Sequence, residues 1–517
     1  MDLHPETDRV AISDLMAQSG VRFGTSGARG PVRRMTDLVC YAYTRAFLEY
    51  QRETGALPPA GGAVVLAGDL RPSTPRILAA AAQAARDLGL DIVHAGRVPS
   101  PALAWAAIRR GIPGVMVTGS HIPEDRNGIK FNRPDGEILK ADEAAIRRRS
   151  VRLPAGRFDA AGAFRPPPGP LPPADPSPLA DYLSRYLAFF PPGCLAGLRV
   201  GLYEHSCVGR EVIGEALAAL GAEVIRLGRT AAFVPVDTEA IRPEDRELAR
   251  RWAREEELAA LVSADGDADR PLMADEAGRW LRGDVAGILA ARYLEADTVV
   301  TPVSSNTALE RSGLFPEVRR TRIGSPYVIE GMLAAARSGR GRVVGYEANG
   351  GFLTASPIAL GGRTLAPLPT RDALLVILCL LHEARRRRVP LSALAAELPP
   401  RFTASDRLRD FPPERSRAVL AALAPEGTAE AAAERALGDL FGPVRRVDLT
   451  DGVRLTFASG EIVHLRPSGN APEFRCYTEA DTEERAAELL GLALGRMEAW
   501  RGGEAGPQAG SPSPSRP

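Results

Sequence analysis

Three aspartates recur at every second position in the segment SADGDADR, residues 263–270. Asp265, Asp267 and Asp269 follow an apolar stretch that is typical of a buried strand. Carboxylates this close together repel one another unless a cation neutralises them. A ligand set made only of oxygen favours Mg²⁺, Mn²⁺ or Ca²⁺ over zinc. The spacing therefore predicts a site for a hard divalent cation.

Two other interpretations of this loop are open. An EF-hand would use the same aspartates and a glutamate at Glu276, but its sixth position requires glycine, and this chain has Arg270 there. The flanking stretches also have the pattern of strands, whereas an EF-hand loop lies between helices. The second alternative is a solvated acidic turn with no bound ion.

A serine that could act as a nucleophile lies in VTGSHIPEDRNGIKF, residues 117–131. Ser120 follows the apolar run GVMV, and open α/β sheets bind ligands at the carboxyl ends of their strands. Gly119 is expected to allow a sharp turn that exposes the hydroxyl. A serine nucleophile needs a base or a metal-polarised partner, and His121 and Lys130 belong to the same loop. A polar turn without chemistry explains this segment alone equally well.

Lys130 is one of only two lysines in the chain, whose remaining strongly basic residues are arginines. Arginine would suffice if only positive charge mattered. Unlike arginine, a lysine near a metal and other cations can have a lowered pKa and give up its proton. We therefore hypothesise that Lys130 takes part in proton transfer, with His121 as the alternative. A solvated loop lysine is the plainer interpretation.

Glu347 and Asn349 lie two residues apart in GYEANGG, residues 345–351. In an extended backbone both side chains would point to the same side and could meet one ligand. A carboxylate together with an amide suits the paired hydroxyls of a sugar. The alternative is a glycine-rich turn.

Two segments rich in arginine and glycine are candidate phosphate sites. Arginine is suited to bidentate recognition of phosphate, and backbone amides can complete an anion cradle. RFGTSGARG, residues 22–30, carries Arg29 without the Walker or dinucleotide-binding spacing. RPSGNAPEFR, residues 466–475, offers Arg466, Ser468, Gly469, Asn470 and Arg475. Either segment could also be a simple surface turn.

The candidate loops follow strands of a repeating α/β pattern. Short apolar stretches such as AVVLAGD, residues 63–69, alternate with helical stretches, which predicts parallel α/β units. The pattern restarts near LRVGLYEHSCVG and again near DTVVTPVSSN, so three related α/β units are expected. The last folded segment differs, because VRRVDL, VRLTF and IVHLRP are separated by tight turns that predict an antiparallel meander.

The overall composition is that of a globular protein, with 45% hydrophobic and 25% charged residues. A net charge of +1 gives no indication of nucleic-acid binding. No apolar run predicts a membrane span, and residues 1–20 lack the apolar core of a signal peptide. The five cysteines have no CxxC spacing, which favours free thiols in a reducing cytoplasm. The sequence does not indicate an oligomeric state.

Taken in order, these five segments resemble those of the α-D-phosphohexomutase superfamily, over roughly residues 20–480. The resemblance implies an α/β fold with three related α/β domains of mixed sheets and a smaller C-terminal α+β domain around a central cleft. Each domain would contribute one loop. The expected domains are residues 1–165, 175–283, 284–398 and 400–501, followed by a disordered tail at 502–517.

The resemblance also implies roles for the candidate residues. The expected catalytic residues are Ser120, Lys130, His121 and Arg29. Ser120, as phosphoserine, would hold Mg²⁺ together with Asp265, Asp267 and Asp269. The expected substrate-binding residues are Arg270, Ser325, Glu347, Asn349, Arg466, Ser468, Gly469, Asn470 and Arg475.

The implied activity is that of a cytoplasmic phosphohexomutase acting on the 6- and 1-phosphates of mannose or glucose. Phosphoserine would form a hexose 1,6-bisphosphate, which would also prime the enzyme. Two departures leave the preferred hexose open. The sugar loop reads Glu347-Ala-Asn-Gly-Gly351 where Ser-Gly-His is usual, and another loop reads Gly324-Ser325 where Gly-His is usual. Phosphoglucosamine mutase is the nearest alternative, and a non-catalytic sugar-phosphate-binding protein is the alternative of another class.

Overall fold

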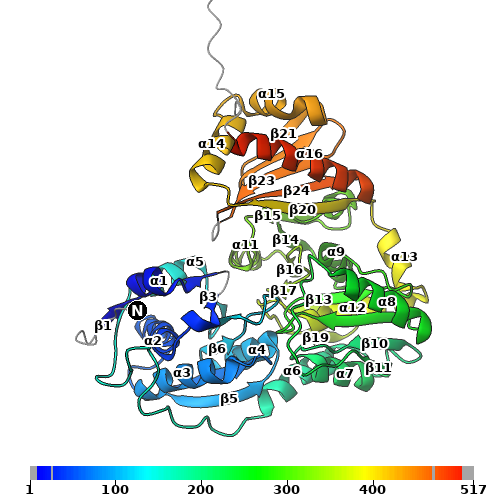
Figure 1. The fold of residues 1–517 in the computed structure, drawn as a ribbon. Helices are drawn as coiled ribbons and strands as arrows, with labels where there is room; N and C mark the ends of the chain where they lie inside the picture. The colour runs from blue at the N-terminus through cyan, green and yellow to red at the C-terminus, as the bar shows by residue number, and fades with distance from the viewer. Residues whose placement is uncertain (1–8, 25–26, 469–471, 503–517) are drawn as a thin grey trace, which may run out of the picture. The chain divides into compact units, whose positions relative to one another are not determined.

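The computed structural model describes residues 9–24, 27–468 and 472–502 (Figure 1). The chain forms two compact units. The first comprises residues 1–301, 315–319 and 324–397, and the second comprises residues 302–314, 320–323 and 398–517. The division into four domains at the expected boundaries stays a prediction.

The first sheet of the first unit carries the serine loop. Its strand order is β2-β3-β7-β6-β4-β5, with β8 paired to β7. β4 is parallel to β5 and β6, whereas β7 is antiparallel to β3 and β6. The strands are β2 (Arg22–Phe23), β3 (Gly27–Pro31), β4 (Ala63–Gly68), β5 (Asp91–Arg97), β6 (Gly114–Val117), β7 (Arg126–Arg133) and β8 (Gly136–Glu137). Beside this sheet, β1 (Arg9–Ala11) pairs with β9 (Ser150–Arg152).

Both faces of this sheet are covered by helices, which explains why its central strands are apolar throughout. Val64 and Leu66 of β4 belong to one core with residues of α2 and α3. Val65 between them is also buried, and α4 contacts β4 and β6. A continuous apolar run is the pattern of a strand buried on both faces. The helices of this region are α1 (Ile12–Ser19), α2 (Asp37–Glu53), α3 (Thr74–Asp87), α4 (Ser100–Arg110) and α5 (Lys140–Arg147), with a 3₁₀ turn at Val32–Arg34.

The second sheet has the strand order β11-β10-β12-β13 and carries the aspartate loop. β10 is parallel to β11 and β12, and β13 returns antiparallel to β12. Its strands are β10 (Arg199–Tyr203), β11 (Glu223–Leu227), β12 (Ala260–Ala264) and β13 (Pro271–Ala274). The helices are α6 (Ser177–Phe189), α7 (Arg210–Ala219) and α8 (Pro243–Glu255).

The third sheet, β15-β14-β16-β17, repeats this arrangement. β14 is parallel to β16, and β17 returns antiparallel to β16 after the loop that holds Glu347. The strands are β14 (Thr298–Pro302), β15 (Glu317–Thr321), β16 (Val343–Tyr346) and β17 (Phe352–Thr354), beside the hairpin of β18 (Ile358–Leu360) and β19 (Arg363–Leu365). The helices are α9 (Gly283–Tyr293), α10 (Ala308–Arg311), α11 (Ser325–Arg337), α12 (Ala373–Arg387) and α13 (Leu391–Ala396).

All three sheets thus place a polar loop between a parallel strand and an antiparallel return strand. The loops are residues 118–125 after β6, 265–270 after β12 and 347–351 after β16. This common position confirms the prediction of related α/β units with mixed sheets. In each unit, the polar loop holds candidate functional residues.

The second unit contains a fully antiparallel sheet with the order β20-β24-β23-β22-β21. Its helices and strands enclose one apolar core. The predicted meander is confirmed, while β20, at the edge of the sheet, was not predicted. The elements are β20 (Phe402–Arg409), α14 (Pro413–Leu423), α15 (Ala429–Phe441), β21 (Val444–Asp448), β22 (Val453–Phe457), β23 (Ile462–Pro467), β24 (Glu473–Ala480) and α16 (Glu483–Arg501).

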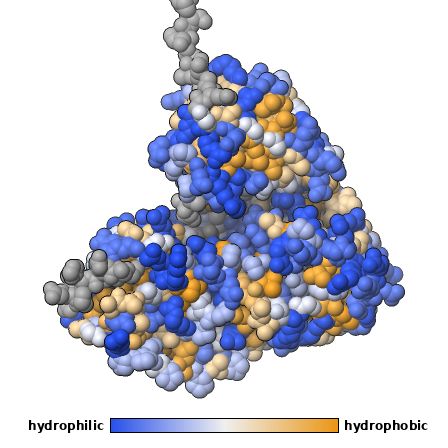
Figure 2. Space-filling view, viewed as in Figure 1, coloured by the Kyte–Doolittle hydropathy of each residue, from blue (hydrophilic) through white to orange (hydrophobic). Residues whose placement is uncertain are grey.

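The molecular surface is mixed in character. Figure 2 shows hydrophilic residues over much of the displayed face, with groups of hydrophobic residues between them. Among the helices that the structure describes, none is both long and apolar enough to span a membrane.

Candidate active site

Ser120 lies directly beyond β6 in a left-handed backbone conformation, with φ of 56°. This conformation is uncommon for a residue with a Cβ atom, and the Thr118 hydroxyl supports it by accepting the Ser120 N–H at 2.9 Å. The Ser120 side chain is buried, and its Oγ donates to Asp265 Oδ2 at 2.5 Å. The prediction that this hydroxyl is exposed is therefore wrong in this conformation, because the aspartate loop covers it.

Arg71 determines the shape of the serine loop. Its fully buried guanidinium donates to four backbone carbonyls within residues 120–126 and pairs with Asp69 at 3.2 Å. Gly119 is needed here for space, since a Cβ atom at that position would lie 2.5 Å from Arg71 Cζ. Sequence reasoning assigned the sharp turn to Gly119 and missed Arg71. Arg71 lies shortly after β4 in a segment with the pattern of a turn, and nothing local to it indicates a buried arginine.

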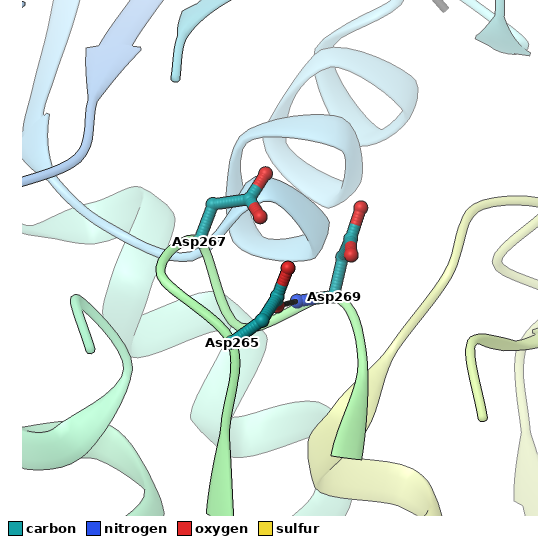
Figure 3. A group of neighbouring side chains, drawn as sticks. All are labelled: Asp265, Asp267 and Asp269. Atoms are coloured by element: carbon teal, nitrogen blue, oxygen red, sulfur yellow. Dashed lines mark hydrogen bonds between the residues drawn. The ribbon is translucent and has the colours of Figure 1, made fainter. Parts of the chain in front are cut away.

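The three aspartates point to the same side of the β12–β13 loop (Figure 3). Asp265, Asp267 and Asp269 are buried, and each offers a carboxylate oxygen within 4.8 Å of the others. Asp267 Oδ1 and Asp269 Oδ1 are buried without a hydrogen-bond partner in the described part of the chain. Buried polar atoms normally have partners, so these orphaned oxygens fit a cation. A Cβ atom at Gly266 would lie 2.6 Å from the Ser120 carbonyl oxygen, which shows how closely the two loops approach.

Both alternatives for the aspartate loop fail on this geometry. The flanking elements are strands β12 and β13, and Glu276 accepts a hydrogen bond from Ser392 Oγ, so an EF-hand is excluded. A solvated turn is excluded because the three carboxylates are buried. Burial, together with the charges of Asp267 and Asp269, raises the pKa of Asp265 well above its ordinary value. A divalent cation would offset that repulsion, and the donor set of carboxylate oxygens suits Mg²⁺.

Lys130, on β7, reaches across to the aspartate loop. Its Nζ donates to Asp267 Oδ2 at 2.5 Å and to Asp269 Oδ2 at 2.7 Å. Burial acts to lower the pKa of Lys130, but the two carboxylates outweigh it and the net shift is upward. The expected lowering of this pKa is therefore wrong for this arrangement, in which Lys130 is an ammonium group.

His121 is a neutral imidazole in this environment. Its Nδ1 accepts a hydrogen bond from Arg270 Nη1 at 2.9 Å and lies 3.4 Å from Ser120 Oγ. Burial, with Arg270 and Arg29, lowers the pKa of His121 to about 2. Burial, with Arg270 and Arg371, also lowers the pKa of Arg29 to about 10. The guanidinium groups of Arg270, Arg29 and Arg371 are therefore all close to His121, the neighbour of Ser120. Positive charge in this position is the electrostatic condition for holding a phosphoryl group.

The sugar-loop candidates differ in what their side chains contact. Glu347 is buried and accepts a hydrogen bond from Arg371 Nη1 at 3.2 Å. Asn349 turns its Oδ1 back to its own loop, where it accepts the Gly351 N–H at 2.9 Å. Ser325 is fully buried at the start of α11 and donates to Glu137 Oε2 at 3.2 Å. The roles of these residues in substrate binding stay predictions.

The candidate phosphate loop belongs to the second unit. Arg466 and Arg475 are directly opposite each other on β23 and β24. Arg466 pairs with Asp451 at 2.9 Å, and Arg475 pairs with Glu473 at 3.2 Å. The Ser468 N–H donates to the Glu473 carbonyl at 2.8 Å. The remaining candidates, Gly469 and Asn470, lie outside the described residues.

Three segments of the chain match protein-family descriptions. Residues 20–153 match phosphoglucomutase/phosphomannomutase alpha/beta/alpha domain I, residues 282–402 match domain III, and residues 414–491 match the C-terminal domain. A phosphomannomutase of Sinorhizobium fredii is 43% identical over 482 residues, covering 92% of this chain and 98% of that protein. The chain belongs to the α-D-phosphohexomutase superfamily. It is accordingly an enzyme, a mutase of the phosphotransferase type.

Other phosphohexomutases support the same assignment. A phosphomannomutase of Salmonella muenchen is 41% identical over 489 residues, covering 95% of this chain and 98% of that protein. The solved structure of a phosphoglucomutase/phosphomannomutase family protein from Burkholderia thailandensis superposes with a TM-score of 0.71 at 20% identity, covering 96% of this chain and all of that one. At this identity, the structural likeness supports the fold.

Proposed function

We propose that this phosphohexomutase interconverts the 6-phosphate and the 1-phosphate of mannose, with the glucose phosphates as its second substrate pair. The observation that carries the proposal is the similarity to two phosphomannomutases at 43% and 41% identity along nearly the whole chain. Phosphoglucosamine mutases match at lower identity, such as 31% over 509 residues for the enzyme of a Parafrankia strain. That activity is therefore the second candidate.

Ser120 is proposed to carry the transferred phosphoryl group. The bond between phosphorus and Ser120 Oγ breaks as a bond to a sugar oxygen forms, which gives a hexose 1,6-bisphosphate. The sugar hydroxyl loses its proton, and Oγ gains one. After the intermediate reorients, its other phosphoryl group returns to Ser120, and the same bisphosphate primes an enzyme that has lost its phosphate. The support is the buried Oγ beside Asp265 and the cations around it.

The aspartate loop is proposed to hold Mg²⁺ together with an oxygen of the Ser120 phosphate. When bound, the ion neutralises charge on the transferring phosphoryl group. Lys130 holds two carboxylates of this loop in place, because it donates to Oδ2 of both Asp267 and Asp269. Within the described chain, the Oδ1 atoms of these two carboxylates are then the ones without hydrogen bonds, and Asp269 Oδ1 lies 3.7 Å from Arg270 Nε. Arg270 and Arg29 supply fixed positive charge for the phosphoryl oxygens.

Substrate selection is assigned to residues of two loops. The buried Glu347 carboxylate is proposed to accept hydrogen bonds from sugar hydroxyls, with Asn349 beside it. Arg466, Ser468, Gly469, Asn470 and Arg475 are proposed to bind the phosphate that is not being transferred. A charge-assisted hydrogen bond of this kind contributes about 1.5–3 kcal/mol.

A coupled mutase assay with Mg²⁺ and a hexose 1,6-bisphosphate tests the proposal. The assay compares mannose, glucose and glucosamine phosphates, and we expect the highest kcat/KM with mannose phosphates. Intact-mass measurement after incubation with the bisphosphate should show one phosphoryl group, mapped by peptide analysis to Ser120. Turnover confined to glucosamine phosphates would favour the second candidate, and absence of the phosphoserine would refute the mechanism.

A further inference from the structure

One guanidinium connects the aspartate loop with the sugar loop. Arg371, directly before α12, has a side chain that is 3% exposed. Its Nη2 pairs with Asp269 Oδ2 at 2.9 Å, and its Nη1 donates to Glu347 Oε2 at 3.2 Å. Arg371 is therefore shared by a proposed metal ligand and the proposed sugar-binding carboxylate. The function proposed above assigns no role to Arg371.

The surroundings of Arg371 fix the position of this guanidinium. On one side, the preceding Thr370 donates its hydroxyl to Glu137 Oε1 at 2.6 Å. On the other side, the Asp372 carboxylate caps the N-terminus of α12 and accepts a hydrogen bond from Tyr182 at 2.7 Å. The side chain then crosses the sugar loop so closely that a Cβ atom at Gly351 would lie 2.5 Å from Arg371 Cδ. These contacts therefore fix both the backbone and the side chain of Arg371 in position.

The geometry explains why arginine is needed at this position. The two nitrogens of its rigid fork meet two carboxylates that belong to different loops, whereas a lysine presents one point charge. Arg371 and Lys130 both contact Oδ2 of Asp269, whereas Oδ1 of that carboxylate makes no hydrogen bond within the described chain and has only the longer ion pair with Arg270 Nε, at 3.7 Å, beside it. The same guanidinium separates Glu347 from Asp269, two buried negative charges that would otherwise repel each other.

We propose that Arg371 is a positioning residue that couples the two loops. It orients the Glu347 carboxylate for sugar hydroxyls and turns Asp269 so that Oδ1 is available to a cation. The inference rests on the proposed role of Glu347 in sugar binding. It predicts that one substitution changes both the KM for the sugar phosphate and the requirement for Mg²⁺.

The test compares Arg371→Lys with a matched control, Arg185→Lys. Arg185 is equally buried, with a side chain 2% exposed, and it pairs with Asp372 at 3.7 Å. Among the described residues it makes no hydrogen bond or ion pair with the serine, aspartate or sugar loop. Both variants keep a positive charge and a similar change in packing, so a general loss of stability should affect them alike.

For Arg371→Lys we expect the KM for the hexose phosphate and the Kd for Mg²⁺, measured by calorimetry in the absence of substrate, each to rise about tenfold, the scale of one lost charge-assisted hydrogen bond. For Arg185→Lys we expect both values within about twofold of the parent. In a Glu347→Gln background, Arg371→Lys should raise KM much less than in the parent, because residues that act through each other are not additive.

Each other result would count against the inference. Equal effects in Arg371→Lys and Arg185→Lys would show a merely structural role, and an unchanged KM increment in the Glu347→Gln background would show that Arg371 does not act through Glu347. These outcomes are separate from a failure of the proposed function, which would appear as absent turnover of mannose and glucose phosphates in the parent enzyme.

Discussion

Ser120 Oγ donates a hydrogen bond of 2.5 Å to Asp265 Oδ2, although the two residues are 145 positions apart in the chain. The contact joins the loop after β6 of the first sheet to the loop after β12 of the second sheet. It places the proposed nucleophile beside the proposed metal ligands. A phosphate on Oγ would therefore meet a cation at the site proposed for that loop, which is the arrangement that phosphoryl transfer requires.

The first prediction concerns Ser120→Ala. We expect loss of nearly all turnover and no phosphoryl uptake from hexose 1,6-bisphosphate, because no oxygen remains to accept phosphorus. Intact mass and the coupled assay measure both effects. Ser100→Ala is the matched control, since Ser100 Oγ also donates to this cluster, to Asp267 at 2.5 Å, but is not a proposed nucleophile. The control should still take up the phosphoryl group, and turnover by Ser120→Ala close to the parent rate would refute the phosphoserine.

The second prediction concerns Asp267→Asn. The substitution removes one of three charges from the cluster, so the Mg²⁺ concentration at half-maximal rate should rise at least about tenfold. A metal titration of the rate measures this shift. Asp275→Asn is the control, because Asp275 is also buried near the same hairpin but caps backbone N–H groups at Ala277 and Arg279. The control should lose stability without a shift in the metal midpoint. An unaltered midpoint in Asp267→Asn would place the ion elsewhere.

The third prediction concerns pH and the second unit. Burial lowers the pKa of His464 to about 4, and Arg454 and Arg466 add to this, although a hydrogen bond to the Asp451 carbonyl and the Asp451 charge oppose it. The unfolded chain then binds the proton more tightly than the folded chain does. The stabilisation is complete above the ordinary histidine pKa of about 6.5 and is lost as the pH falls toward about 4.

His464→Gln should remove this pH dependence. The free energy of unfolding of the parent should fall by about 1.4 kcal/mol per pH unit through that window from this residue alone. Denaturant unfolding between about pH 4 and pH 7 measures the slope, with Tyr477→Phe as a control for the ring that stacks on His464 at 5.3 Å. Equal slopes in the parent and in His464→Gln would show that another group is responsible.

The sequence predicted where the polar loops lie along the chain, but it did not predict which residues contact one another between the loops. The spacing of Asp265, Asp267 and Asp269 on one hairpin is local, and a two-residue period after an apolar strand is visible without a structure. Arg71 and Arg371 were missed because their partners lie far away in the chain. Arg71 follows a strand in a segment that reads as a turn, and Arg371 precedes a helix. Nothing local to either residue shows that four carbonyls or two carboxylates converge on it.

Neighbouring charges reversed one expectation from the sequence. A lysine near cations was expected to have a lowered pKa, yet Lys130 lies between Asp267 and Asp269, and these carboxylates raise it. The sign depends on which charges dominate in space, and strand β7 brings Lys130 into contact with Asp267 and Asp269, whose effect outweighs the opposing charge of Arg371. Residue types predicted the ionic character of the site, but only the packing of β7 against the aspartate loop determined the direction of this shift.

The last prediction concerns Lys130→Arg, and its matched control is Lys140→Arg. These are the only two lysines in the chain. Lys130 donates to Asp267 and Asp269, whereas Lys140 donates to Glu143 at 2.6 Å on α5 and is 40% exposed. Arginine keeps the charge at either position, and at position 130 its several N–H donors can still serve both Asp267 and Asp269, so the fold and the Mg²⁺ midpoint should change little in both variants.

The two variants should differ in kcat. An ammonium group can donate a proton to an oxygen that leaves phosphorus, and a guanidinium cannot do so in the working pH range. We therefore expect Lys130→Arg to lose about 10²-fold or more of kcat, the usual scale for general acid–base catalysis, and Lys140→Arg to stay within about twofold. Because the imidazole of His121 is neutral and accepts from Arg270, it is a weaker candidate for this donor. If Lys130→Arg turns over within about threefold of the parent, charge alone suffices at this position, and the proton donor is another group.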